Sequence, residues 1–305
     1  MRLYTHPACL LHDPGPGHAE QPARLLAVLQ ALDQDRFAAL DRVEAPLATR
    51  EQLLRVHDAA HIERILAGAP KEGFIRLDED TLMSPGSADA ALRAAGAVIA
   101  AVDHAMSGEN RRAFCAVRPP GHHATGAHAM GFCLFNNIAV AAAHALQQHG
   151  LKRVAIADFD VHHGNGTQAI FEREPRVLFV SSHQSPLYPG TGGEDEHGVG
   201  NIVNGTLSPG AGSLEFRELW DHLLLPRMHA FKPQLVLVSA GFDAHRNDPL
   251  ADIRLGKEDY AWITGQLLAL SQRHAAGRLV STLEGGYDLA ALATSTAAHV
   301  DELMR

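Results

Sequence analysis

The sequence predicts an α/β fold in which a central, largely parallel sheet is flanked by helices. Two observations carry this prediction. Short apolar runs of 5 to 6 residues, the length of a buried strand, alternate with longer segments of helical periodicity. Polar residues follow these runs, as expected where parallel strands end at one edge of a sheet. No repeat or low-complexity linker divides the chain, so residues 1–305 are interpreted as one domain.

The predicted strands are apolar, which suits strands covered on both faces. In order, they are Arg112–Val117, Arg153–Ala157, Arg176–Val180, Gln234–Ser239 and Arg278–Leu283. Helical patterns lie before and between them, at Pro22–Leu40, Ser87–Met106, Asn136–His149, Leu214–His229 and Lys257–Ala276. This alternation is typical of parallel sheets with helical connections.

Local signals place several helix ends. Pro22 stands near a first turn, where its missing N–H leaves no bond unmade. Gly150 and Gly277 follow the third and fifth helices as candidates for the left-handed residue that ends a helix. Pro226 is expected to kink or end the fourth helix. The stretch Gln184–Gly200 is too long for an ordinary connection and is therefore predicted to be a functional loop.

Composition excludes several classes of protein. With 46% apolar and 20% charged residues, the chain is not a disordered one, and 3 cysteines are too few for a disulfide scaffold. A formal charge of -9, with no basic run longer than Arg111-Arg112, argues against nucleic-acid binding. His6 and Pro7 break any secretory signal, and the apolar run Ala94–Val102 is too short to span a membrane. A cytoplasmic protein without membrane association is therefore expected.

Histidine is unusually frequent, with 20 residues in the chain. Histidine binds metals and moves protons near neutral pH, but its abundance does not place a site. Position relative to the predicted strands does. The five predicted strands run into His122-His123, Asp158 to Asn165, Ser181 to His183, Asp243 to His245, and Glu284 to Tyr287. Because ligands of parallel sheets bind outside the carboxyl ends of the strands, these residues are predicted to form one site.

Asp160 and His162 lie two positions apart, so they point to the same side of an extended segment. They form half of a zinc site, and Asp243 is a candidate third ligand. Three protein ligands leave a position open for water, as catalytic zinc requires. Asp158 shares the same parity and is interpreted as a carboxylate that orients a neighbouring imidazole. The alternative, that Asp158 and Asp160 only cap the next helix, is less favoured for an Asp-x-Asp-x-His-His run.

Two further motifs gain meaning from their position. His122-His123 is an adjacent pair that would more often be a surface feature, but it follows a predicted strand in a Pro- and Gly-rich segment. Gly285-Gly286-Tyr287 indicates close approach of the backbone and a phenol placed over the site, although a simple turn would also explain it.

A dinucleotide-binding oxidoreductase is the alternative hypothesis from a different functional class. Gly164-Asn-Gly166-Thr-Gln-Ala169 fits the G-x-G-x-x-A pattern. However, polar residues separate the strand from the first glycine, and Pro175 to Gly193 holds no acid where the ribose ligand is expected. The glycines are therefore interpreted as allowing backbone to pass close to a metal site.

Six motifs together resemble the histone deacetylase superfamily, and within it the class II-like bacterial amidohydrolases. They are Arg118-Pro-Pro-Gly-His-His-Ala124, Gly131-Phe-Cys-Leu-Phe-Asn-Asn137, Asp158-Phe-Asp-Val-His-His-Gly-Asn-Gly-Thr167, Tyr188-Pro-Gly-Thr-Gly192, Ser239-Ala-Gly-Phe-Asp-Ala244 and Leu283-Glu-Gly-Gly-Tyr287. The resemblance implies a single α/β domain of the arginase–deacetylase type. It also implies a zinc-dependent deacylase that hydrolyses an N-acyl lysine or a related acyl-amine.

The resemblance assigns roles to individual residues. Those matching the zinc ligands are Asp160, His162 and Asp243; those matching the catalytic groups are His122, His123, Tyr287, Asp158 behind His122, and Asn165 behind His123. His123 is the expected general base, while His122 holds the water and stabilises charge. The Tyr287 hydroxyl is expected to donate to the oxygen on which negative charge develops.

A cation site and a substrate channel are also implied. A structural monovalent cation, usually potassium, matches the side chains of Asp158 and Ser181 with the carbonyls of Asp160, His162 and Ser182. The aromatic walls of an acyl-lysine channel match Phe132, which follows Gly131, and Tyr188. Asp80 resembles, more loosely, the rim carboxylate that grips the substrate backbone.

Two positions depart from patterns seen in relatives. Asn165 stands where the class I branch has an aspartate, and a neutral amide raises the basicity of an imidazole less than a carboxylate does. This departure matches the class II-like branch. Leu250 stands where a polyamine-deacetylating vertebrate relative has a glutamate, so the chain offers no carboxylate there to a second ammonium.

Acetylpolyamines or other small amides are the same-class alternative for the substrate. A non-catalytic, metal-dependent binding module is disfavoured because the motifs are intact. No partner beyond the substrate is predicted, and a homo-oligomer stays open.

Overall fold

An eight-stranded sheet, parallel throughout, forms the centre of the computed structural model, which describes residues 1–108 and 110–305. Its strand order is β2-β1-β5-β10-β9-β6-β7-β8. The strands are β1 Arg2–Thr5, β2 Asp41–Glu44, β5 Arg112–Cys115, β6 Val154–Asp158, β7 Val177–Gln184, β8 Ile202–Leu207, β9 Leu235–Ala240 and β10 Leu279–Leu283. A small antiparallel pair, β3 Ile75–Arg76 and β4 Leu82–Met83, lies apart from this sheet.

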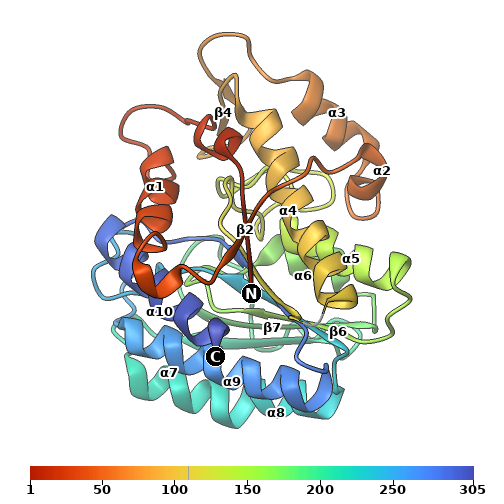
Figure 1. Cartoon of the computed structure of the whole chain (residues 1–305), viewed down its shortest axis with the longest axis vertical. Coiled ribbons are helices and arrows are strands. Elements are labelled where there is room, and N and C mark those ends of the chain that lie inside the picture. The colour runs from red at the N-terminus through yellow and green to blue at the C-terminus, as the bar shows by residue number, and fades with distance from the viewer. Residues whose placement is uncertain (109) are drawn as a thin grey trace.

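Helices cover both faces of the sheet (Figure 1). One layer contains α4 Ser87–Ser107, α5 Asn137–Gln148 and α6 Asn165–Phe171; the other contains α7 Ser213–Leu219, α8 Leu225–Phe231 and α9 Lys257–His274. Helices α1 Pro22–Ala31 and α10 Leu289–Met304 pack against each other, and α10 also packs on α9. The short helices α2 Arg50–Leu53 and α3 Ala59–Ala67 lie with β4 at the end of the molecule away from α7–α9. None of the helices in the described ranges is both long and apolar enough to cross a bilayer.

All five predicted strands are present, and the predicted α/β class with a parallel sheet is confirmed. The strands that were not predicted are β1, β2 and β8 of this sheet and the small pair β3 and β4. β2 is an exposed edge strand with the sequence Asp-Arg-Val-Glu, and β8 contains Asn204 and Gly205, so neither shows a continuous apolar run. Backbone pairing of β2 with β1 and of β8 with β7 stabilises these strands, although their own sequences do not show the apolar pattern of a buried strand.

Two helix predictions need correction. The helix predicted over Pro22–Leu40 ends at Ala31, and a separate turn follows at Asp35–Phe37. Pro226 does not end its helix, because a π-helical turn at Trp220–Leu224 joins α7 to α8 directly before it; the predicted kink at Pro226 stays a prediction. The widened turn lets the chain continue through a residue that has no N–H to donate.

The two strands that carry the predicted metal ligands, β6 and β9, are neighbours in the middle of the sheet. Every residue in both strands is buried. Their apolar side chains pack under helices on both faces, which anchors the polar segments that follow each strand.

Candidate metal centre and active site

Asp160 and His162 follow β6, and Asp243 follows β9, so the two neighbouring strands bring the predicted ligands together. The Nδ1 atom of His162 lies 3.1 Å from Asp160 Oδ1 and 3.1 Å from Asp243 Oδ2. Ligand atoms bound tetrahedrally at zinc distances of about 2.0–2.1 Å lie about 3.3 Å apart, so this spacing fits one metal ion.

The charge of this group also fits a cation. Both carboxylates are completely buried. Burial, followed by the negative charge of Asp160, raises the pKa of Asp243 to about 7. Two buried carboxylates beside one imidazole carry excess negative charge, which a divalent cation would neutralise.

A second group has a different geometry: it consists of Asp103 on α4, His144 on α5 and His149, which directly follows α5. Both imidazole Nε2 atoms lie 2.7 Å from the same oxygen, Asp103 Oδ1. The guanidinium of Arg55 donates to Nδ1 of His144 over 2.6 Å, so Nε2 of that ring carries the proton. This group is a hydrogen-bonded network on the outer layer, and its short distances are those of hydrogen bonds.

Glycines allow the backbone to approach the predicted metal ligands. The Gly285 N–H donates to Asp160 Oδ2 over 2.8 Å. A Cβ atom at Gly285 would lie 2.0 Å from Asp243 Oδ2, and one at Gly241 would lie 2.0 Å from Asp160 Oδ2. The predicted close approach at Gly285-Gly286 is therefore present, and no larger residue fits there.

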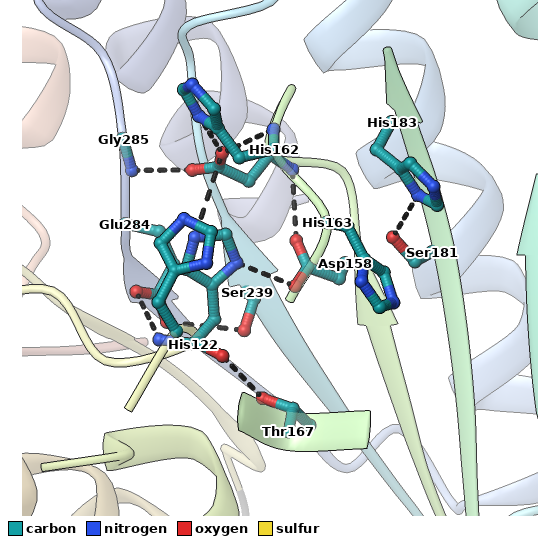
Figure 2. Close-up of polar contacts among 12 residues, drawn as sticks. His122, Asp158, His162, His163, Thr167, Ser181, His183, Ser239, Glu284 and Gly285 are labelled. Atoms are coloured by element: carbon teal, nitrogen blue, oxygen red, sulfur yellow. Dashed lines mark hydrogen bonds and ion pairs between the residues drawn. The ribbon is translucent and has the colours of Figure 1, made fainter. Parts of the chain in front are cut away.

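The tandem histidines lie beside the predicted metal ligands, and each ring is hydrogen-bonded through Nδ1; Figure 2 shows this contact for His122 and Asp158. His122 Nδ1 is 2.9 Å from Asp158 Oδ2, and His123 Nδ1 is 2.8 Å from Asn165 Oδ1. Asp158 thus orients an imidazole, as predicted. Burial opposes a charged His122, but Asp160 and Asp158 raise its pKa to about 10. Burial and the neighbouring His122 lower the pKa of His123 well below its usual range.

The glycines of the dinucleotide-like pattern pack against this arrangement. A Cβ atom at Gly164 would lie 2.4 Å from Asp158 Oδ2. One at Gly166 would lie 2.2 Å from the carbonyl oxygen of Ala124, in the tandem-histidine segment. Both glycines are accounted for by close packing at the site.

Tyr287 is held by two residues that the sequence reading did not single out. Its backbone N–H donates to Asp248 Oδ2 over 2.7 Å. Arg24, on α1, lies over its ring and donates from Nε to the Gly286 carbonyl over 2.6 Å. Glu20 and Arg24 form a buried ion pair, and their i,i+4 spacing is the one sequence signal that could have pointed to Arg24.

The histone deacetylase domain family model matches residues 18–303. The chain belongs to the histone deacetylase family. It is 42% identical over 293 residues to a histone deacetylase-like amidohydrolase of Pseudomonas aeruginosa, covering 94% of this chain and 77% of the relative. A probable deacetylase of Archaeoglobus fulgidus is 40% identical over 294 residues, covering 94% and 81%. The crystal structure of the HDA15 HD domain superposes with a TM-score of 0.93 at 36% identity, covering 99% of this chain and 87% of the other.

Membership of the histone deacetylase family confirms the predicted resemblance and the arginase–deacetylase type of fold. It also indicates an enzyme that acts on amides.

In this histone deacetylase domain, aromatic side chains stand beside the buried groups. The ring centre of Phe132 is 5.8 Å from that of Tyr287, and the ring centre of Tyr188 is 5.2 Å from that of His123. Phe132 has a positive φ of 67°, and Asp80 Oδ1 accepts the N–H of the preceding Gly131 over 3.2 Å. Asp80 therefore supports the segment that carries Phe132.

Leu250 is partly buried, and its N–H donates to Asp248 Oδ1 over 3.1 Å, so it belongs to the same short segment that holds the backbone of Tyr287.

The predicted functional loop, Gln184–Gly200, carries Tyr188. Two buried histidines hold this loop through hydrogen bonds. His163 Nδ1 lies 2.8 Å from Thr191 Oγ1, and His183 Nε2 lies 3.0 Å from the Gly192 carbonyl. His163 and His183 thus have the supporting positions expected from the sequence.

Of the residues predicted for potassium, Asp158 and Ser181 lie opposite each other, paired in register, on the neighbouring strands β6 and β7. Ser181 Oγ lies 2.9 Å from His183 Nδ1, and Ser182 Oγ accepts the indole N–H of Trp220 over 3.1 Å. Figure 2 shows Ser181 and His183 on the strand beside Asp158.

Proposed function

We propose that the chain, acting as one deacetylase domain over residues 1–305, is a zinc-dependent deacylase. It hydrolyses the amide of an N-acyl lysine or a related acyl-amine to a carboxylate and a free amine. The observation that carries this proposal is the convergence of a three-ligand group, a tandem histidine pair and a tyrosine at the carboxyl ends of neighbouring strands.

The family is generally zinc-dependent, and the ligand set Asp160, His162 and Asp243 suits zinc in donor type, spacing and charge. Zinc held there supplies Lewis acidity that polarises the acyl carbonyl and activates a water molecule. The protein contributes ligands fixed by buried strands and by the Gly285 N–H.

His123 is the proposed general base. Asn165 Oδ1 accepts the Nδ1–H of His123, which leaves Nε2 with a free lone pair in the neutral ring. The lowered pKa of His123 keeps that ring neutral. Nε2 takes a proton from water and returns it to the nitrogen of the leaving amine.

His122 and Tyr287 act on charge. His122 is held protonated by Asp158 and Asp160, so its positive charge stabilises the negative charge that develops during water attack. Burial raises the pKa of Tyr287 well above its usual range, so the phenol keeps its proton and donates a hydrogen bond to the acyl oxygen.

A structural potassium ion is proposed between β6 and β7. Its ligands would be the side chains of Asp158 and Ser181 with the carbonyls of Asp160, His162 and Ser182. The in-register pairing of Asp158 with Ser181 supports this.

The substrate enters between Phe132 and Tyr188, whose rings flank Tyr287 and His123. A narrow aromatic passage suits the apolar stem of an acyl-lysine. Asp80 is the proposed rim carboxylate, and Leu250 presents no charge to a second ammonium. This favours acyl-lysine over acetylpolyamine.

The test is hydrolysis of an acetyl-lysine peptide by the zinc-loaded protein, with acetylputrescine as the competing substrate. We expect higher kcat/KM on the peptide, loss of activity with a chelator, and a loss of at least about 100-fold in His123→Ala. His149→Ala, which alters the outer histidine network, is the matched control and should retain activity. Full activity in His123→Ala would overturn the mechanism.

A further inference from the structure

Glu284 is a completely buried carboxylate with no part in the chemistry described above. It directly follows β10, in the centre of the sheet. Its Oε2 accepts the backbone N–H of Gly121 over 2.6 Å and that of His122 over 3.2 Å, and its Oε1 accepts the hydroxyl of Ser239 over 3.3 Å. Figure 2 shows Glu284 between His122 and Ser239. One side chain therefore ties the tandem-histidine segment to the sheet.

The segment that Glu284 holds has little support from regular secondary structure. Residues 116–136 lie between β5 and α5 and include only an isolated bridge. The carbonyl of His122 accepts the N–H of Thr167 over 3.2 Å, at the first turns of α6. The backbone of His122 is thus held on its N–H side by Glu284 and on its carbonyl side by α6, while its ring is held by Asp158.

Packing alone does not explain a carboxylate at this position. Burial raises the pKa of Glu284 to about 7, so the protein keeps an ionisable group where an apolar side chain would avoid desolvation. Hydrogen bonds from the two backbone N–H groups compensate for that desolvation. Without the carboxylate, these two N–H groups would be left without this acceptor in a buried site.

The chain next to Glu284 reaches the other parts of the site. The Glu284 N–H donates to the Ala240 carbonyl over 3.0 Å, which fixes it to β9. The adjacent Gly285 N–H holds the metal ligand Asp160, and Tyr287 follows two residues later. Residues 284–287 therefore contact the tandem-histidine segment and the predicted metal ligand Asp160, and they include the tyrosine itself.

We propose that Glu284 is a positioning residue that sets the tandem histidines in register with the metal ligands and Tyr287. The carboxylate acts through its two hydrogen bonds to backbone and not on the substrate. The kinetic consequence rests on the proposed deacylase function, whereas the structural consequence does not.

Three variants of the zinc-loaded protein separate this role from others. Glu284→Ala removes the acceptor, and we expect kcat to fall about 100-fold with KM changed less than about threefold, because misplacement of a catalytic group by about 1 Å has an effect of that size. Glu284→Gln keeps an oxygen facing the two N–H groups and should retain kcat within about threefold. Ser239→Ala, the matched control, removes only the third contact and should resemble the unmodified protein.

A readout independent of turnover is the hydrogen-bonded Nδ1–H of His122 in protein labelled with ¹⁵N in its histidine rings, with the signal assigned by its loss in His122→Ala. We expect this proton to shift or exchange faster in Glu284→Ala, with zinc content retained, and to stay unchanged in Glu284→Gln and Ser239→Ala. The buried ring of His299, bonded to Thr264 and Ser281, serves as an internal reference.

The outcomes are decisive. A folded, zinc-containing Glu284→Ala with normal kcat and an unchanged His122 signal would overturn the proposal. Equal loss in Glu284→Gln and Glu284→Ala would also overturn it, because the charge and not the geometry would then matter. If the unmodified protein hydrolyses no acyl-amine while the His122 signal responds as expected, the deacylase function fails and the positioning role stands.

Discussion

The guanidinium carbon of Arg24 lies 4.7 Å from the centre of the Tyr287 ring. The same guanidinium donates to the carbonyls of Glu284, over 2.5 Å, and Gly286, over 2.6 Å, and it is paired with the buried Glu20. A cation over the aromatic face stabilises the ring position, and the two carbonyl contacts fix the backbone on either side of Gly285. Arg24 is therefore a clamp on the segment that carries the tyrosine.

Arg24→Met should lower kcat about 10- to 100-fold while KM changes little, because the tyrosine loses its fixed position and its cationic neighbour. Stability should also fall by about 3 kcal/mol, since the buried Glu20 loses one of its partners. Steady-state kinetics and urea denaturation measure the two effects. Arg50→Met, which removes an exposed arginine paired with Glu63, is the control and should change neither quantity. Unaltered kcat in Arg24→Met would contradict the clamp.

Tyr287→Phe should reduce kcat about 100- to 1,000-fold, since it removes one hydrogen-bond donor to the oxygen that gains charge. Zinc content and the melting temperature should stay close to those of the unmodified protein, because the phenyl ring keeps its contacts with Phe132 and Arg24. The measurement is hydrolysis of an acetyl-lysine peptide together with metal analysis. Loss of zinc in this variant would mean that the tyrosine supports the ligands and does not act on the substrate.

Gly285→Ala should abolish zinc binding. The added Cβ would lie 2.0 Å from Asp243 Oδ2 and 2.6 Å from Asp160 Oδ2, so the ligands must move apart or turn away. Gly212→Ala is the matched control, because its Cβ would meet nothing closer than Glu215 Oε2 at 3.7 Å. Metal content after dialysis and the zinc-dependent shift of the melting temperature report the difference. Equal zinc content in both variants would argue against the assigned ligands.

His299 predicts an acid-sensitive stability that is unrelated to the metal. Burial lowers the pKa of this ring to about 3, whereas in the unfolded chain it is about 6.5. Between these two pKa values, His299 binds a proton in the unfolded state but not in the folded state. Its contribution to the free energy of unfolding is therefore fully present above pH 6.5 and is lost as the pH falls from 6.5 towards 3. Between pH 7 and pH 5 this residue should account for about 2 kcal/mol of the loss.

The measurement is the free energy of unfolding from urea curves at pH 7 and pH 5, compared between the unmodified protein and His299→Gln. The glutamine can still bond Thr264 and Ser281 but does not titrate. Between pH 7 and pH 5, the free energy of unfolding of His299→Gln should fall by about 2 kcal/mol less than that of the unmodified protein. Identical drops would show that His299 is not the source.

Much of the site was predictable because its residues follow apolar strands. The short run Val-Ala-Ile-Ala before Asp158 suits a buried strand, and the strand ends at Asp158, which places Asp160 and His162 directly beyond its carboxyl end. The same argument could not find Arg24 or Asp248. These residues act on Tyr287 from α1 and from a loop after β9, and only tertiary packing brings them close.

The missed elements failed for a related reason. β2 carries three charged residues among its four, and its strand character comes from hydrogen bonding to β1. The helix that stops at Ala31 has apolar residues beyond it, and Phe37 enters the core from a separate turn. Apolar periodicity reports burial, and burial does not require that the backbone stay helical.

The strand order has a consequence for how such a chain can diverge. The predicted metal ligands stand after β6 and β9, in the middle of the sheet, whereas Tyr188 stands on a long loop after β7, the strand beside the edge strand β8. Substitution or lengthening of that loop would reshape the proposed substrate entrance without disturbing the strands that precede the predicted metal ligands. Related chains can thus diverge in their preference for the acyl chain and the backbone of the substrate while they keep the same arrangement of residues after β6 and β9.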